Sequence, residues 1–296
     1  MKRILLLFCG MTLSVLVFAQ KDWSWWNELH GWEPGMPGWR SFVTISPGYL
    51  GPNALPVPDV KKGFIEEEKA IELGSDFHFR TGDNTQNLFA KLYYPFAENK
   101  IAIEVYGVFL EHYSMSDEIR DERKARDKDG EGLAIGDLYF STLIQLFRDR
   151  KFPNTLLRMA AKTASGGRLD AARYADSPGY FFDLSFSKTY SKIEKSLSWT
   201  PFASIGFYSW QTNDDMNLQN DALMYAAGFD WSKNNWTISN SLSGYMGYKN
   251  EKDKPLVYTF DVNKQLKNDA IRLQFIQGVN DWKYSTVKLS YIWKWN

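Results

Sequence analysis

The sequence is poor in the residues that several classes of protein depend on. Its one cysteine, Cys9, lies inside an N-terminal apolar run, too early for a lipid-anchor site, so the rest of the chain has no thiol for a disulfide, a metal centre or a nucleophile. Only 3 histidines are present, and no glycine loop of the phosphate-binding kind occurs. Lysine plus arginine (35) equals aspartate plus glutamate (35), so no excess of charge favours nucleic acid. We therefore expect no cofactor, no metal site and no nucleic-acid partner.

Residues 1–19 have the features of a secretory signal peptide. Lys2 and Arg3 give a positive start, an uncharged apolar run follows as far as Phe18, and cleavage after Ala19 would release the mature chain. The run is too short to span a bilayer as a helix, and no later stretch reaches the roughly eighteen apolar residues that a spanning helix needs. We expect an exported protein. Such a chain could lie within a membrane only as a β-barrel, because every backbone polar group must be paired in lipid.

From residue 70 to the C-terminus the sequence shows the two-residue period of β-strands. In the last segment Val287, Leu289, Tyr291 and Trp293 alternate with mostly polar residues, so they would share one face of a strand. The pattern predicts twelve strands, most of them long enough to cross a bilayer at a tilt. The predicted ranges are 70–81, 87–97, 100–113, 133–147, 154–164, 179–190, 199–212, 221–232, 236–248, 255–264, 269–277 and 284–295.

The connections between these strands favour a membrane barrel over a soluble β-sandwich. With the C-terminus in the periplasm, the connections alternate between inside and outside, and the two longest, 113–133 and 164–179, both fall outside. Aromatic residues make up 16% of the chain, which suits two interfacial girdles. A sandwich would present a polar outer face and would need no girdles. We predict an all-β fold, a transmembrane antiparallel up-and-down β-barrel of about twelve strands, over residues 70–296.

Residues 20–69 are irregular and rich in tryptophan and proline. Proline at this density breaks helices and removes hydrogen-bond donors from sheets. The tryptophans, which include Trp23, Trp25 and Trp26, argue against simple disorder. We expect an N-terminal extension that packs at the periplasmic end of the barrel or enters the barrel as a partial plug.

The phase of the strands assigns a set of charged side chains to the barrel interior. Both signs occur in similar number, which favours mutual pairing across a narrow interior over the single-sign lumen of an ion-selective pore. A salt-bridge network that only holds the barrel closed and a conducting pore both fit this pattern. The candidate lumen-facing residues are Glu72, Asp76, Arg80, Lys91, Glu104, Asp137, Arg158, Lys162, Asp183, Asp230, Asp261, Arg272 and Lys288.

Two predicted outer loops have unusual composition. Residues 116–132 carry dense charge of both signs, which suits a cation-bridged contact with lipopolysaccharide phosphates or with a surface partner. Residues 163–179 are small and hold Arg168 and Arg173, and they could fold over the pore mouth as a constriction. For both loops we favour the plainer interpretation, a solvated loop, since runs of charge are usually solvated.

Two local features resemble known barrels. The aromatic C-terminal strand resembles the closing strand of outer-membrane β-barrels, which the barrel insertion machinery reads. A hairpin is similar to barrels identified as transporters of the phenol-degradation (MetA) pathway: Gly136, Asp137 and Leu138 open one strand, Pro153 lies in the turn, and Lys-Thr-Ala-Ser-Gly at 162–166 ends the next strand. These resemblances imply a Gram-negative outer membrane, with lipid and lipopolysaccharide around the protein, and porin-like uptake of a small solute.

The sequence thus predicts a narrow channel or transporter for a small-molecule solute, without chemistry. One alternative is a structural or adhesion barrel whose charged loops contact lipopolysaccharide or a surface partner. Another is a hydrolase, since His112 and Ser114 resemble the pair in outer-membrane lipid A deacylases, with Asp117 or Glu118 as an orienting acid. A histidine beside a serine is usually a coincidence, so we do not favour the hydrolase.

Overall fold

A computed structural model describes residues 22–148, 151–192 and 197–295. The predicted signal peptide, residues 1–19, lies outside the described residues. The chain divides into two units, Met1–Pro37 and Gly38–Asn296. In the first, the short helix α2 (Ser24–His30) ends at Gly31, whose left-handed backbone lets its N–H donate to the carbonyl of Asn27.

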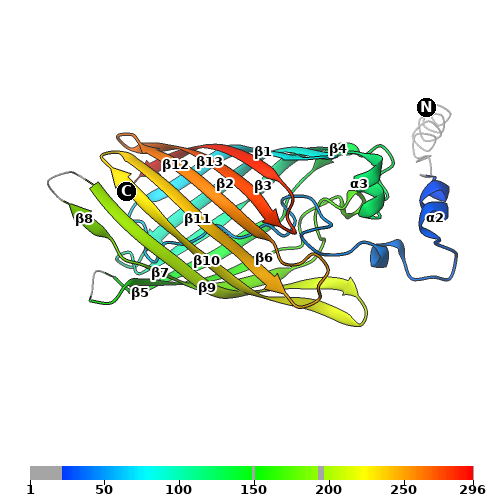
Figure 1. Cartoon of the computed structure of the whole chain (residues 1–296), viewed down its shortest axis with the longest axis horizontal. Helices are drawn as coiled ribbons and strands as arrows, with labels where there is room; N and C mark the ends of the chain where they lie inside the picture. Colours follow the sequence, from blue (N-terminus) through cyan, green and yellow to red (C-terminus); the bar gives the residue numbers. More distant parts are fainter. Residues whose placement is uncertain (1–21, 149–150, 193–196, 296) are drawn as a thin grey trace, which may run out of the picture. The chain divides into compact units, whose positions relative to one another are not determined.

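The second unit is a closed antiparallel β-barrel (Figure 1). The sheet has 14 strands, and all but the short strands β4 and β8 form a ring of twelve, in which neighbours in the chain pair and β14 pairs back with β1. Closure leaves the ring without an unpaired edge. The ring consists of β1 (Lys69–Arg80), β2 (Asp83–Phe96), β3 (Ile101–Met115), β5 (Leu138–Phe147), β6 (Asn154–Lys162), β7 (Gly179–Ser187), β9 (Leu197–Asp214), β10 (Asn217–Lys233), β11 (Trp236–Gly247), β12 (Leu256–Gln265), β13 (Asp269–Asn280) and β14 (Ser285–Trp295).

The predicted fold class and the twelve strands are confirmed, with small shifts at their ends. One prediction needs correction: the expected strand 133–147 is broken in two. β4 (Glu131–Ala134) pairs with residues 111–114 near the end of β3. The chain then leaves the sheet, and β5 begins at Leu138. Asp137 leaves the ladder because its carboxylate binds Lys162 (2.7 Å) and accepts from the N–H of Gly166 (2.7 Å). The short strand β8 (Tyr190–Lys192) adds to β9 at the opposite end of the barrel.

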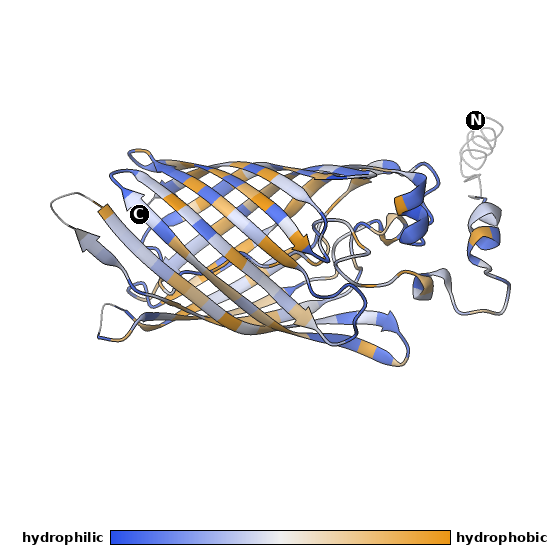
Figure 2. Cartoon of the chain, in the orientation of Figure 1, coloured by the Kyte–Doolittle hydropathy of each residue, from blue (hydrophilic) through white to orange (hydrophobic). Residues whose placement is uncertain are grey.

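The outer wall of the barrel is apolar at every second position (Figure 2). Along β14, Val287, Leu289, Tyr291 and Trp293 are exposed, while Thr286 and Ser290, on the other face of the strand, are buried. A soluble protein rarely exposes so large an apolar surface, so this band is a lipid-contacting surface. Within the described residues no helix has both the length and the apolar character needed to cross a membrane.

Exposed tryptophans gather near the end of the barrel that has the short turns. Trp199 and Trp231 are partners across β9 and β10, and Trp236 lies directly after the β10–β11 turn. Trp293 pairs with Asp269 beside the β12–β13 turn. Tryptophan prefers the boundary between lipid and water, so this ring has the position of one interfacial girdle.

The two ends of the barrel differ in the length of their connections. The end with the C-terminus of β14 has short turns such as 97–100 and 266–268, and the other end carries 116–137 and 163–178. The first of these long loops holds helix α3 (Asp117–Glu122) and the second the 3-10 turn η2 (Leu169–Ala171). Following the rule that outer-membrane barrels keep their long loops outside, we call the long-loop end the outer end.

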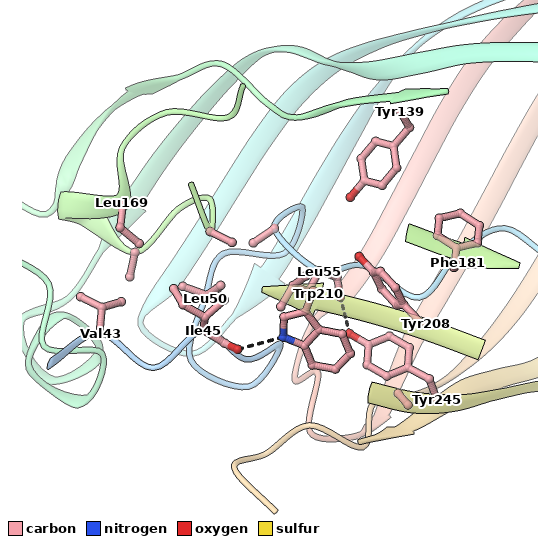
Figure 3. Close-up of a cluster of buried hydrophobic side chains, with 14 of the residues drawn as sticks. Val43, Ile45, Leu50, Leu55, Tyr139, Leu169, Phe181, Tyr208, Trp210 and Tyr245 are labelled. Atoms are coloured by element: carbon pink, nitrogen blue, oxygen red, sulfur yellow. Dashed lines mark hydrogen bonds between the residues drawn. The ribbon is translucent and has the colours of Figure 1, made fainter. Parts of the chain in front are cut away.

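Residues 43–68, which we call the lumen segment, run through the barrel from its outer end to the start of β1 (Figure 1). Near the outer end the Trp210 indole donates to the carbonyl of Ile45 (3.1 Å), and deeper in the barrel the Tyr245 hydroxyl donates to the carbonyl of Leu55 (2.8 Å; Figure 3). At the opposite end the Ile65 N–H donates to the Gln145 amide oxygen (2.8 Å). The segment has no regular structure of its own, so the wall supplies the partners that its backbone lacks.

A prediction follows for Gly278, near the end of β13. Its N–H donates to the carbonyl of Tyr284, and a Cβ at this position would overlap the carbonyl oxygen of Trp282. Gly278→Ala should therefore force the backbone apart and lower the free energy of unfolding by roughly 1–3 kcal/mol, as measured by urea denaturation of the refolded protein. Gly167→Ala is the matched control, since nothing lies within 4 Å of its Cβ position. Equal stability of the two variants would contradict the close approach of the Trp282 carbonyl to Gly278.

Candidate functional site

A cavity of about 200 Å³ lies inside the barrel between the lumen segment and the wall. Residues 56–60 of the segment form one side of it. The opposite side comes chiefly from the inner faces of β1, β2, β3 and β11 to β14, where charged and hydroxyl side chains lie beside many aromatic and aliphatic ones. Ser239, Ser243 and Thr259 are among the polar residues of this wall, and Phe89 and Val257 are among the apolar ones. The cavity therefore offers a small solute both polar partners and apolar contact surface.

Every predicted lumen-facing charge takes part in an ion pair. The pairs formed within the predicted set are Glu72–Arg272 (3.6 Å), Asp76–Lys288 (3.4 Å), Lys91–Glu104 (2.9 Å), Asp137–Lys162 (2.7 Å), Arg158–Asp183 (2.6 Å) and Asp261–Arg272 (2.6 Å). Strand register explains some of them, because Asp76 lies directly opposite Lys288 and Arg158 directly opposite Asp183.

Two predicted residues find partners outside the barrel wall. Asp230 binds Lys62 of the lumen segment (2.8 Å), and Arg80 lies at the outer end, where it binds Glu122 of α3 (3.1 Å). The structure therefore separates Arg80 from the charges around the cavity. In the segment, Lys61 also contacts Glu104 (2.5 Å). Sequence reasoning missed Lys61 and Lys62, although two adjacent lysines within a proline-rich apolar stretch are a usable signal.

A second cluster of charges closes the outer end of the barrel. Arg173, from the loop 163–178, is fully buried and contacts Glu111 (2.8 Å), Asp83 (3.1 Å) and the Thr85 hydroxyl (2.7 Å). Arg123, from the loop after α3, is buried beside it and contacts Asp83 (2.7 Å). Buried carboxylates are costly without a cation, so these two arginines compensate charges that the wall alone leaves unpaired.

This cluster corrects the interpretation of both long loops as solvated. Arg123 and Arg173 point into the barrel mouth, and Leu169 and Tyr174 are buried with them. The loop 163–178 instead narrows the barrel mouth, as in the alternative interpretation that we gave for residues 163–179. The dense charge at 116–132 concealed this role, because composition alone does not distinguish a charge that faces water from one that faces a buried carboxylate.

The outer loops are also tied to each other and to the lumen segment. Glu122 of α3 binds Lys252 of the β11–β12 loop (2.7 Å), and the carbonyl of Lys252 accepts hydrogen bonds from Ser46 and Gly48. Burial alone would raise the pKa of Glu122, but the hydrogen bond and charge of Lys252, with the charge of Arg80, hold that pKa below its ordinary value. The carboxylate therefore stays ionised at neutral pH and keeps the loops connected.

The residues considered for hydrolysis do not form a catalytic group. His112 lies near the outer end of β3, and its ring contacts Gln86 (3.3 Å) and Glu131 (3.4 Å). In the part of the chain that the structure describes, no hydrogen bond joins His112 to Ser114. A nucleophile needs its base within hydrogen-bond reach, so the geometry gives the deacylase alternative no support.

No protein-family model matches this chain, and no curated protein matches it in sequence. Solved structures match it in fold. The COG4313 outer membrane channel from Pseudomonas putida F1 superposes with a TM-score of 0.56 at 12% identity, over 80% of this chain and 100% of that chain. The KdgM porin gives a TM-score of 0.45 at 8% identity (76% and 99% covered), and the transport unit of the autotransporter AIDA-I from Escherichia coli gives 0.45 at 8% (82% and 94%).

At these identities the comparison shows a shared fold, that of an outer-membrane β-barrel. The resemblance to the barrels of the MetA pathway stays a prediction, as does the signal peptide.

Removing Arg173 should loosen the outer end of the barrel. Arg173→Ala leaves Glu111 without its buried cation, at a cost of roughly 3 kcal/mol, so amide hydrogen exchange in residues 163–178 should become about a hundredfold faster. Arg40→Ala is the control, because Arg40 forms an exposed ion pair with Asp176, and such pairs contribute at most about 1 kcal/mol. Unchanged exchange in Arg173→Ala would mean that the cluster does not hold this loop.

Proposed function

We propose that this protein is a narrow outer-membrane channel for a small solute, with the lumen segment as a plug inside it. The observation that carries the proposal is the cavity of about 200 Å³ beside the segment, lined by charged and hydroxyl side chains together with aromatic and aliphatic ones. A ring of twelve strands encloses more space than the eight-stranded barrels that side chains alone fill. Here the plug takes up part of that space, and the cavity that remains suits the passage of a small solute.

The shared fold with the Pseudomonas outer membrane channel supports this role by analogy. The wall supports it on physical grounds. Ion pairs around a space of this size keep the wall hydrated without leaving any one charge uncompensated, and a hydrated, charge-balanced wall lets a polar solute pass at low cost.

The plug is anchored more firmly at its ends than in its middle. Its outer part is bonded through Ile45, Ser46 and Gly48, and its inner part through Gly63 and Ile65. Between residues 56 and 60 the one side-chain hydrogen bond in the described structure comes from Arg158, which donates to the carbonyl of Asp59 (2.9 Å). The middle can therefore move while both ends stay attached, and such a movement would widen the cavity.

Passage also requires the outer end to open, because Arg123 and Arg173 fill the mouth. The loop of Arg173 is joined to the plug directly, since the N–H of Gly51 donates to the carbonyl of Ala172 (2.8 Å). The loop of Arg123 is joined to it through Lys252, which binds Glu122 and accepts from the N–H of Gly48. We propose that the plug and the mouth loops move together. In the closed state, the plug then obstructs the lumen while Arg123 and Arg173 obstruct the mouth. The structural or adhesion role has less support, since Arg123 of the mixed-charge loop is turned inward to Asp83 and Arg120 is buried against acidic residues of its own loop.

Single-channel conductance of the refolded protein in planar bilayers tests the proposal. The full chain should show low or rare conductance, and a variant that lacks residues 22–68 should show larger and steadier conductance, because the plug is gone. A variant that lacks only residues 22–37 keeps the plug and should behave like the full chain. Silence of all three proteins, with insertion verified, would favour a sealed scaffold and end the channel proposal.

A further inference from the structure

The ion pairs around the cavity are arranged in layers, although their charges balance. In three pairs the carboxylate is the deeper partner and the cation reaches toward the open space. The side chain of Lys91 is 18% exposed against 2% for Glu104, Lys288 21% against 4% for Asp76, and Arg272 23% against 10% for Asp261. A solute in this part of the cavity would therefore meet these three cations before the carboxylates that they pair with, and we call the three cations the cationic surface.

Asp59 of the lumen segment faces this cationic surface. It lines the cavity, its side chain is exposed, and it interacts electrostatically with Lys288, Arg272, Lys91 and Lys61. Among the described residues no cation lies within the 4.0 Å that defines an ion pair with its carboxylate. The carboxylate is thus held by the field of several cations and not by contact with any one of them.

On the basis of the proposed channel, we infer that Lys91, Arg272 and Lys288 form a binding site for the carboxylate group of a small solute, and that Asp59 occupies this site in the closed state. A carboxylate held without direct contacts is easily replaced by another of the same charge that does make contacts. A solute carboxylate would thus compete with Asp59, and its binding would favour movement of the weakly anchored middle of the plug.

The other two classes of small solute fit this site less well. A cation would be attracted by Asp59, but it would then meet Lys91, Arg272 and Lys288, which are more exposed than the carboxylates that they pair with. An uncharged solute could accept hydrogen bonds from Ser239, Ser243 and the three cations, but it would gain no attraction between opposite charges. An anion alone gains from the cationic surface, and the planar arginine group of Arg272 suits a carboxylate in particular.

Calorimetric titration of the full chain in detergent micelles with succinate tests the inference, with uncharged succinamide as the probe of matched size. Succinate should bind and succinamide should not. Asp59→Asn removes the internal competitor and should tighten succinate binding by about tenfold. Lys288→Gln should weaken it by about tenfold or more. The controls are Glu98→Gln and Lys100→Gln, whose exposed side chains lie at the β2–β3 turn and should leave binding unchanged.

The titration measures binding and does not require conduction, so the binding site and the proposed channel can fail independently of each other. Binding that Asp59→Asn strengthens, in a barrel that never conducts, would keep the site and remove the channel. Conduction without succinate binding would keep the channel and overturn the site. Equal binding of succinate and succinamide, or no change in Asp59→Asn, would also overturn it. Asp59→Asn carries the test if Lys288→Gln folds poorly, because Asp59 has an exposed side chain without a direct ion pair among the described residues.

Discussion

Charge compensation inside a closed barrel is the constraint on which the rest of this structure depends. Lipid surrounds the wall, so a charge that faces inward has only the lumen in which to find a partner. The wall pairs some of its charges across neighbouring strands, as Arg158 and Asp183 show. For others it depends on chain from outside the wall: Lys62 of the lumen segment for Asp230, and Arg123 and Arg173 of the outer loops for Asp83 and Glu111. Plug and loops are therefore structural parts of the closed barrel.

The sequence predicted the barrel well because lipid imposes a regular pattern. Each strand must place apolar side chains outward at every second position, and long and short connections must alternate between the two ends of the barrel, so strand ranges and the positions of the long loops could be predicted without a relative for comparison. The same alternation along the strands predicted which charged side chains point inward, and each of these side chains forms an ion pair in the structure. Pairs such as Glu72 with Arg272 were not predictable, because they depend on how β14 closes against β1.

The parts that follow no period were not predictable in the same way. The lumen segment has neither a helical nor a strand pattern, and its path is set by partners more than a hundred residues away, such as Trp210 for Ile45. The arginines of the mouth lie in loops whose charged or small residues do not distinguish a buried loop from a solvated one. In both cases a buried partner decides the position, and a partner distant in the chain leaves no local signal. Asp59 belongs to this group, and it links the plug to the cationic surface of the cavity.

The lumen segment crosses the barrel, so the residues directly before it, such as Ser41, lie at the outer end. Ser41→Cys tests this most directly, because the sequence has no cysteine after Cys9 and Ser41 is exposed. An impermeant thiol reagent should label this variant in intact cells, as it should label Met216→Cys in the outer β9–β10 turn, but not Glu98→Cys in the inner β2–β3 turn. If Ser41→Cys were labelled only after the cells are broken, as Glu98→Cys should be, the segment would not cross the barrel and the account of a plugged lumen would be wrong.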